Sequence, residues 1–144
     1  MQTFLPYPNF KQSASVLDMR RLGKQRIEAI EILKISLGKE SRWKHHPAVK
    51  MWKGYEHALS HYTRCIIEEW RRRGYNDSLL GKLAVICTDF DLLSNVETIL
   101  PWWLGLDEFH SKHRATLLFK LPAHYSTFGW IENPEYGYLW PTKI

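Results

Sequence analysis

Residues 15–38 read SVLDMRRLGKQRIEAIEILKISLG, and this stretch decides the fold because its apolar side chains recur at helical spacing. Ser15 is the expected N-cap, with Asp18 three residues later, and Gly38 is the expected end of the helix. The apolar stripe consists of Met19, Leu22, Ile30, Leu33 and Leu37. Arg26 occupies the same stripe, so its charged group must be paired or must face a ligand.

Three further stretches continue the helical pattern. A second helix is expected from Pro47 to about Arg73, because Pro suits a first turn and apolar residues follow every three or four positions. A third helix is expected from Ser78 to Leu93. A fourth is expected from Glu108 to about Leu121, capped by Asp107 and stopped by the Pro that follows.

Both ends of the chain are expected to be ordered without a long helix. Residues 3–10 hold two prolines among aromatic side chains, which predicts an extended segment pinned to the body by Phe4, Tyr7 and Phe10. Residues 124–144 are rich in aromatic residues, Gly and Pro. The sequence therefore predicts an all-α fold: a compact single domain over residues 1–144, with three to four helices and an irregular aromatic C-terminal wrap.

The composition favours a polyanionic partner. The 144 residues include 20 Lys and Arg against 15 Asp and Glu, a formal net charge of +5. A basic balance of this kind favours nucleic acid over an acidic partner. The seven Trp residues exceed what one small core needs, so some of these rings should work at the surface.

Several classes of protein are not expected. Cys65 and Cys87 form no ligand-spaced cluster, and a chain of this length needs no disulfide, which favours a reducing, cytoplasmic setting. The sequence has no apolar run near 18 residues and no basic segment leading into one, so neither a membrane span nor a secretion signal is expected. It also lacks phosphate loops, nucleotide fingerprints and zinc knuckles. We therefore expect no cofactor and no metal, and a monomer.

One face of the first helix could carry chemistry. Asp18, Arg21, Gln25 and Glu28 are spaced by three, four and three residues, so they share that face, and Lys24 flanks it. One interpretation is a solvated face on which Lys24 pairs with Glu28. The other is a phosphate-binding face that carries one carboxylate.

Histidines occur at two further places of interest. His45 and His46 precede the second helix, where they could bind phosphate with the free N–H groups of the first turn, or simply cap the helix. Two more lie three residues apart on the last helix beside acidic residues, but a metal site is rejected because the sequence places no third ligand. The preferred interpretation there is a basic stripe of His110, His113, Arg114 and Lys120.

The order of several segments resembles the pyrimidine-dimer DNA glycosylase family. These segments are Leu22-Gly23-Lys24-Gln25-Arg26, His46-Pro47, Arg73-Gly74-Tyr75-Asn76, Phe109 through Lys120, and Tyr125 through Trp130. The resemblance spans most of the chain. It implies a helical domain that binds duplex DNA, flips out a nucleotide and cleaves its glycosidic bond. It also implies a nucleophilic N-terminal amine, whose Schiff base permits strand cleavage, and an assisting Glu on the first helix.

The family's catalytic residues transfer unevenly to this chain. Arg26 matches the first-helix arginine and would orient the sugar or base. The next position, expected to hold the catalytic Glu, is Ile27, and Glu28 lies one residue further, about 100° around the helix. Asp18 is the second candidate carboxylate. Met1 would supply the amine if the first ten residues fold it into the site, because the large side chain at position 2 should block its removal.

The sequence thus favours a DNA glycosylase that excises a damaged or modified pyrimidine, with or without an AP-lyase step, in repair or in defence against modified phage DNA. The catalytic candidates are Arg26, Glu28, Asp18 and Met1. The candidate contacts to double-stranded DNA are Arg21, Lys24, Gln25, His45, His46, His110, His113, Arg114, Lys120, Tyr125, Phe128 and Trp130. The alternatives are a non-catalytic DNA-binding domain of the same fold and a helical protein-interaction module with exposed Trp residues.

Overall fold

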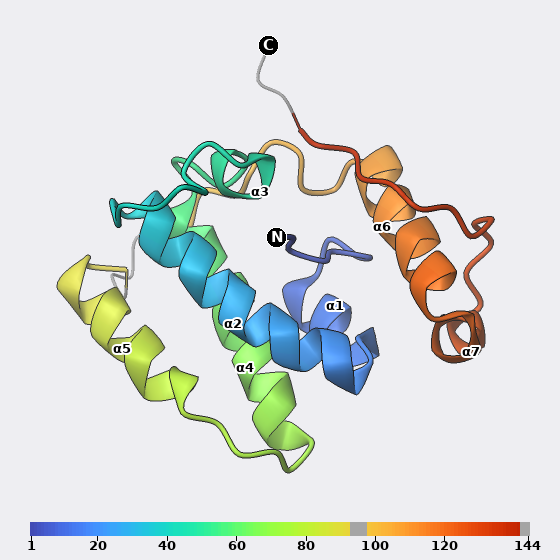
Figure 1. The fold of residues 1–144 in the computed structure, drawn as a ribbon, viewed down its shortest axis with the longest axis horizontal. Helices are drawn as coiled ribbons and strands as arrows, with labels where there is room; N and C mark the ends of the chain where they lie inside the picture. The colour runs from blue at the N-terminus through green and yellow to red at the C-terminus, as the bar shows by residue number, and fades with distance from the viewer. Residues whose placement is uncertain (93–97, 142–144) are drawn as a thin grey trace.

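The computed structural model describes residues 1–92 and 98–141, and these residues form helices without strands (Figure 1). The α-helices are α1 (Phe10–Val16), α2 (Met19–Ser36), α3 (Pro47–Lys50), α4 (Glu56–Arg72), α5 (Leu79–Asp89), α6 (Asp107–Lys120) and α7 (Pro122–Tyr125), followed by a 3₁₀ turn, Ser126–Phe128. The all-α prediction is confirmed. The helices are shorter and more numerous than the three to four expected, because the second predicted helix is interrupted and because α1 and α7 were not predicted.

The first predicted helix corresponds to α2, Ser15 is not its N-cap, and a separate helix that was not predicted, α1, precedes it. Ser15 lies inside α1, and Leu17 adopts an extended conformation that ends that helix. Asp18 is the N-cap of α2, since its carboxylate accepts the Arg21 N–H at 3.4 Å. Met19 is 49% exposed and so does not belong to the apolar stripe. The buried members of that stripe are Leu22, Ile30 and Leu33.

The second predicted helix is interrupted between α3 and α4. Gly54 takes a φ of +88° in this break, a conformation that side chains with a Cβ rarely adopt. The break turns Trp52 into the core, where it is fully buried and its indole N–H donates to the Thr3 hydroxyl at 3.0 Å. This hydrogen bond links the region of the second predicted helix to the N-terminal segment.

The later helices agree more closely with the sequence. The expected end of the third helix, Leu93, lies outside the described residues, and α5 ends at Asp89. Asp107 begins α6 instead of capping it, and Leu106 takes the N-cap position. The tail wraps over α6 as expected, because the Glu135 N–H donates to the Ala115 carbonyl at 3.1 Å.

Three further expectations concern the cysteines, a membrane span and the extent of the domain. Cys65 and Cys87 are free thiols. In the described part of the chain, no helix has the length and apolar character needed to cross a membrane. The expectation of one domain over residues 1–144 stays a prediction.

Helices α2 and α4 pack closely because of Gly23. A Cβ at this position would lie 2.9 Å from Cζ3 of Trp70, so a larger residue would force the two helices apart. One turn further, the Arg26 guanidinium lies over the same indole ring at 4.7 Å. It also bonds the Asp77 carboxylate at 2.5 Å, and the Asp77 side chain is only 2% exposed. Arg26 therefore has the acidic partner that a structural role requires.

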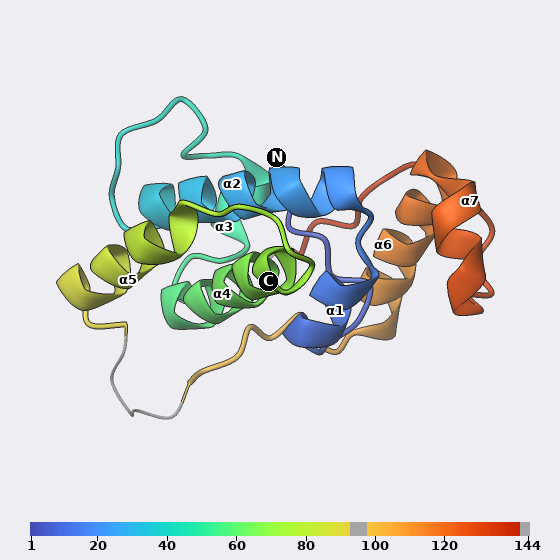
Figure 2. The same cartoon turned by 90° about the horizontal axis from the view of Figure 1, so that it is seen from below.

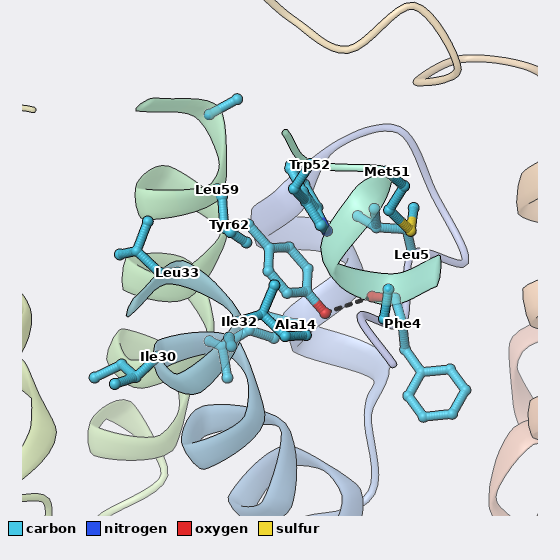
Figure 3. Close-up of a cluster of buried hydrophobic side chains, with 14 of the residues drawn as sticks. Phe4, Leu5, Ala14, Ile30, Ile32, Leu33, Met51, Trp52, Leu59 and Tyr62 are labelled. Atoms are coloured by element: carbon cyan, nitrogen blue, oxygen red, sulfur yellow. Dashed lines mark hydrogen bonds between the residues drawn. The ribbon is translucent and has the colours of Figure 1, made fainter. Parts of the chain in front are cut away.

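Residues 2–6 form an irregular segment whose backbone is bound by side chains from the helices. The amide of Gln25 accepts the Phe4 N–H at 2.9 Å and donates to the Gln2 carbonyl at 2.6 Å. The Tyr62 hydroxyl of α4 donates to the Phe4 carbonyl at 2.8 Å (Figure 3). Because this segment has no ladder of its own, these bonds replace regular secondary structure.

Two histidines of α6 bind the two backbone groups of Leu5 in opposite tautomers. His113 Nδ1 accepts the Leu5 N–H at 2.8 Å, so this nitrogen carries no proton. His110 Nδ1 donates to the Leu5 carbonyl at 2.7 Å, while its Nε2 accepts the Gly105 N–H at 2.9 Å. Burial lowers the pKa of His113 to about 3 and lowers the pKa of His110 below its ordinary value. Both rings are therefore neutral at pH 7.

We predict that Arg26→Gln destabilises the fold by about 3 kcal/mol, because it leaves the buried Asp77 carboxylate without its guanidinium partner. Urea unfolding measures this loss. Arg20→Gln is the matched control, since Arg20 is exposed on the same helix and has no ion pair with a described residue. Adding Asp77→Asn to Arg26→Gln should recover part of the lost stability. An unchanged unfolding free energy for Arg26→Gln would contradict the structural role.

We also predict that stability falls as the pH drops from 7 to 5. The pKa of His113 is about 3 in the fold and near 6.5 in the unfolded chain, so the unfolded chain binds more protons in this window. The stabilisation is complete above pH 6.5 and is lost below it, on the order of 1 kcal/mol per pH unit. His113→Asn, whose Oδ1 can accept the Leu5 N–H, should make this dependence shallower, although His110, whose pKa is also lowered by burial, retains part of it. His45→Gln should leave it unchanged. A wild-type stability that is level over this window would be the opposing result.

Candidate active site

A cavity of about 510 Å³ opens beside the N-terminus. Its walls come from the first residues of the chain, the first half of α2, the end of α6 and the tail. Figure 1 shows why these parts meet: the N-terminus lies between α2 and α6. The cavity brings together six of the predicted site residues on α2 and at the N-terminus: Met1, Asp18, Arg21, Lys24, Gln25 and Glu28.

Glu28 joins the N-terminus to α2 inside this cavity. Its Oε2 accepts the Gln2 N–H at 3.1 Å, and its Oε1 lies 3.6 Å from Lys24 Nζ. The predicted pair with Lys24 therefore exists, but Lys24 is largely exposed and such a pair contributes little. The helix turns Glu28 towards the N-terminal segment. Between the two candidate carboxylates, Glu28 is the one bound to the N-terminal segment.

Asp18 lines the cavity but is already engaged. The Tyr125 hydroxyl donates to Oδ1 at 2.5 Å and accepts the Asp18 N–H at 3.0 Å, while Arg21 NH1 lies 3.2 Å from the same carboxylate. Burial opposes ionisation, but the Tyr125 hydrogen bond and the Arg21 charge outweigh it and lower the pKa of Asp18. The same carboxylate also accepts the Arg21 backbone N–H as the N-cap of α2, so it fixes the start of that helix.

Basic side chains surround the cavity. Arg20, Arg21 and Lys24 come from α2, and Lys120 comes from the end of α6. Burial lowers the pKa of Lys120, and the charges of Arg21 and Lys24 lower it further. Cations held this close together favour an anionic ligand, and Arg20 and Lys120 make no ion pair with any described carboxylate.

Aromatic rings form another part of the wall, where Lys120 Nζ lies 5.2 Å from the centre of the Tyr136 ring. Phe4, Tyr136 and Tyr138 line the cavity, with the Tyr138 ring 6.3 Å from Phe4 and 5.7 Å from Tyr136. Burial, followed by the neighbouring hydroxyl of Tyr136, raises the pKa of Tyr138 to about 12, so its hydroxyl stays neutral. Sequence reasoning missed both tyrosines. The signal was present, because aromatic residues alternate at positions 136, 138 and 140.

The aromatic residues expected at the flipped nucleotide do not line this cavity. Tyr125 is fully buried and stacks on Trp130 at 5.5 Å, so it is core rather than a DNA contact. The indole N–H of Trp130 also has a partner within the chain, because it donates to the Tyr7 hydroxyl at 2.7 Å. Phe128 lies in the same ring cluster and is partly exposed.

The basic stripe predicted on α6 is largely wrong. His110 and His113 are 2% and 1% exposed and bind the backbone of Leu5, so they cannot reach a phosphate. Arg114 donates to the Pro6 carbonyl at 2.7 Å and pairs with Glu132 at 2.9 Å. The α-helical spacing suggested a surface stripe, whereas these side chains hold the N-terminal segment.

The structure also separates Arg26 from the cavity, which Arg26 does not line. Gln25 lines it but is 2% exposed, with its amide bound to the N-terminal backbone. His46 caps α3, because its Nδ1 accepts the Ala48 N–H at 3.0 Å. Burial lowers the pKa of His46, and the positive charge of the N-terminal amine lowers it further. The negative charge of Glu28 acts in the opposite direction, so His46 senses both charged groups of the cavity. His45 is exposed on the preceding loop.

A larger cavity, of about 710 Å³, has the wrong charge for nucleic acid. Its lining includes Glu108, Glu132 and Glu135, with Lys112 paired to Glu135 at 3.1 Å. An acidic wall repels phosphate. Nor do the described residues offer a metal site, since they contain no group of three or more His, Cys, Asp or Glu suited to a metal ion.

Glu28, the N-terminus and the basic side chains of α2 that line the cavity all fall in the part of the chain that a known family shares. The sequence profile of the family described as pyrimidine dimer DNA glycosylase matches residues 1–81. The chain belongs to the pyrimidine dimer DNA glycosylase family. Membership implies DNA glycosylase activity and a DNA substrate. No curated protein and no solved structure matches the chain. Lys120, Tyr136 and Tyr138 complete the cavity of this family member from outside the matched residues.

Proposed function

We propose that this chain excises a damaged or modified pyrimidine from duplex DNA, with the chemistry in the cavity beside the N-terminus. The observation that carries the proposal is the 3.1 Å hydrogen bond from the Gln2 N–H to Glu28 Oε2. It holds the end of the chain, and so the amine of Met1, in the same cavity as one carboxylate. An amine and a carboxylate in one cavity are what nucleophilic cleavage of a glycosidic bond needs.

The cavity's surfaces suit an extruded nucleotide. The cations Arg20, Arg21, Lys24 and Lys120 would bind the phosphates on either side of it. Tyr136 and Tyr138 would present their faces to the flipped base, because aromatic stacking is the common way to hold an unpaired base. Phosphate binding and base recognition would thus come from different side chains of one cavity.

In the proposed reaction the Met1 amine bonds to C1′ of the sugar and the N-glycosidic bond breaks. The bonding electron pair leaves with the base, which takes up a proton. Glu28 accepts the proton that the amine loses and stabilises the positive charge that develops at C1′. Opening of the sugar ring then gives a Schiff base, from which strand cleavage follows. With water as the nucleophile instead, Glu28 would activate that water and the reaction would stop at base release.

The alternative is a DNA-binding domain that keeps the fold without the chemistry. Both would bind DNA with a strong salt dependence, but only the enzyme releases a free base. Incubation with duplexes that carry different damaged or modified pyrimidines, followed by mass analysis of the released bases, separates the two. The same panel distinguishes repair from defence, since a bulky phage-type modification and an ultraviolet lesion are both included.

We predict that Glu28→Gln lowers the rate of base release by about 10²- to 10⁴-fold. The Gln amide oxygen can still accept the Gln2 N–H, so the melting temperature should change little. The matched control is Glu31→Gln on the same helix, whose carboxylate pairs with Lys39 outside the cavity. Its rate should stay within about twofold of wild type. Equal rates for Glu28→Gln and wild type would rule out the assigned role.

A further inference from the structure

A second basic surface lies at the far end of α2. It is a recess of about 370 Å³ formed by the end of α2, the loop that follows and the region around α3. We call it the lysine recess. Its charged lining consists of Lys39, Glu40, Lys44, Lys50 and Lys53, with His45 beside them.

Most of the cations in the lysine recess are not neutralised. Lys44, Lys50 and Lys53 are exposed, and none of them makes an ion pair with a carboxylate of the described chain. Lys39 differs, because its Nζ lies 2.8 Å from Glu31 Oε1. Among the described residues, the lining therefore carries three lysines without an ion-pair partner against one carboxylate, Glu40, that also has none, so positive charge is in excess.

The dipole of α2 does not explain this cluster. Cations close to a helix C-terminus stabilise it, and Lys34 in the last turn of α2 fills that role. Lys50 and Lys53 belong instead to the end of α3 and the turn after it. Their convergence on one recess from separate elements points to a ligand with several negative charges.

The lysine recess lies on the same side of the molecule as the cavity. Figure 2 shows the N-terminus, α2 and the loop after α2 along one edge. Glu28 of the cavity and Ser36 of the recess are eight residues apart on α2, which is about 12 Å along the helix. Phosphates of one DNA strand advance about 3.4 Å along the duplex axis per step. A duplex that reaches the cavity would therefore also reach the recess, with phosphates a few base pairs from the flipped nucleotide.

We infer that the lysine recess binds the DNA backbone on one side of the flipped nucleotide, as a second phosphate site separate from the cavity. This rests on the proposed function, since it takes the cavity as the place of the flipped nucleotide. The contacts are to phosphates only, so they fix the position of the duplex and carry no base specificity.

The first test removes the three unpaired charges with Lys44→Gln, Lys50→Gln and Lys53→Gln in one variant. Binding to a duplex with one abasic site is measured by fluorescence anisotropy over a range of salt concentrations. The slope of log affinity against log salt should fall by about 2 to 3, because each phosphate contact contributes about 0.9. The control variant removes three exposed cations elsewhere, with Lys11→Gln, Arg71→Gln and Lys82→Gln. Equal changes in both variants would overturn the inference.

The second test shortens the DNA. Wild type should lose affinity when the flank on one side of the abasic site is cut to about two base pairs, and should tolerate the same cut on the other side. The lysine-recess variant should be insensitive to either cut. If wild type and the lysine-recess variant lose affinity alike with each shortened duplex, the recess does not bind the duplex.

Base release separates this inference from the proposed function. At saturating DNA the recess variant should release base at the wild-type rate, with only KM raised. If the recess does not bind DNA but the proposed chemistry is right, wild type still releases base and Glu28→Gln still releases it slowly. Failure of the proposed chemistry leaves DNA binding with the one-sided length dependence but no released base.

Discussion

The hydrogen bonds that side chains make to the backbone of residues 2–6 are the interaction on which the rest of the structure depends. This segment has no helix or strand to satisfy its N–H and C=O groups, and it is buried. Gln25 of α2, Tyr62 of α4 and His113 of α6 satisfy them instead. A buried polar group left without a partner costs about 1 to 3 kcal/mol, so losing any one of these side chains is expensive. The segment in turn joins α6 to the helices α2 and α4, and each part holds the others in position.

The same constraint produces the site. Because the backbone at residues 2–5 is fixed, the Gln2 N–H meets Glu28 and the end of the chain stays in the cavity. The neutral state of the two α6 histidines is part of this arrangement, since each ring needs an unprotonated nitrogen to accept a backbone N–H. The cavity also depends on the tail, which supplies Tyr136 and Tyr138 from outside the residues that match the family. We therefore expect the choice of base to depend on the tail more than on α2.

The sequence predicted those features that follow from local spacing. The apolar periodicity gave an all-helical fold and the buried face of α2, and the odd position of Arg26 correctly demanded either a partner or a ligand. Spacing could not identify that partner, because Asp77 lies 51 residues away. It likewise could not show that the α6 histidines point inward, since their partners are backbone groups of Leu5 more than 100 residues earlier. The break before α2 was missed because Asp18 as an N-cap competes with Ser15, and only packing decides between them.

The central claim is that the N-terminal amine, which shares the cavity with Glu28, attacks the sugar. Borohydride trapping with peptide mapping tests this claim most directly. The protein is mixed with a duplex that carries an excised or abasic site, reduced with borohydride and digested with trypsin. The account predicts a single stable adduct on the N-terminal peptide, Met1 to Lys11, and its loss when the amine is acetylated. An adduct on Lys24 or Lys120, or base release with no adduct at all, would contradict the claim.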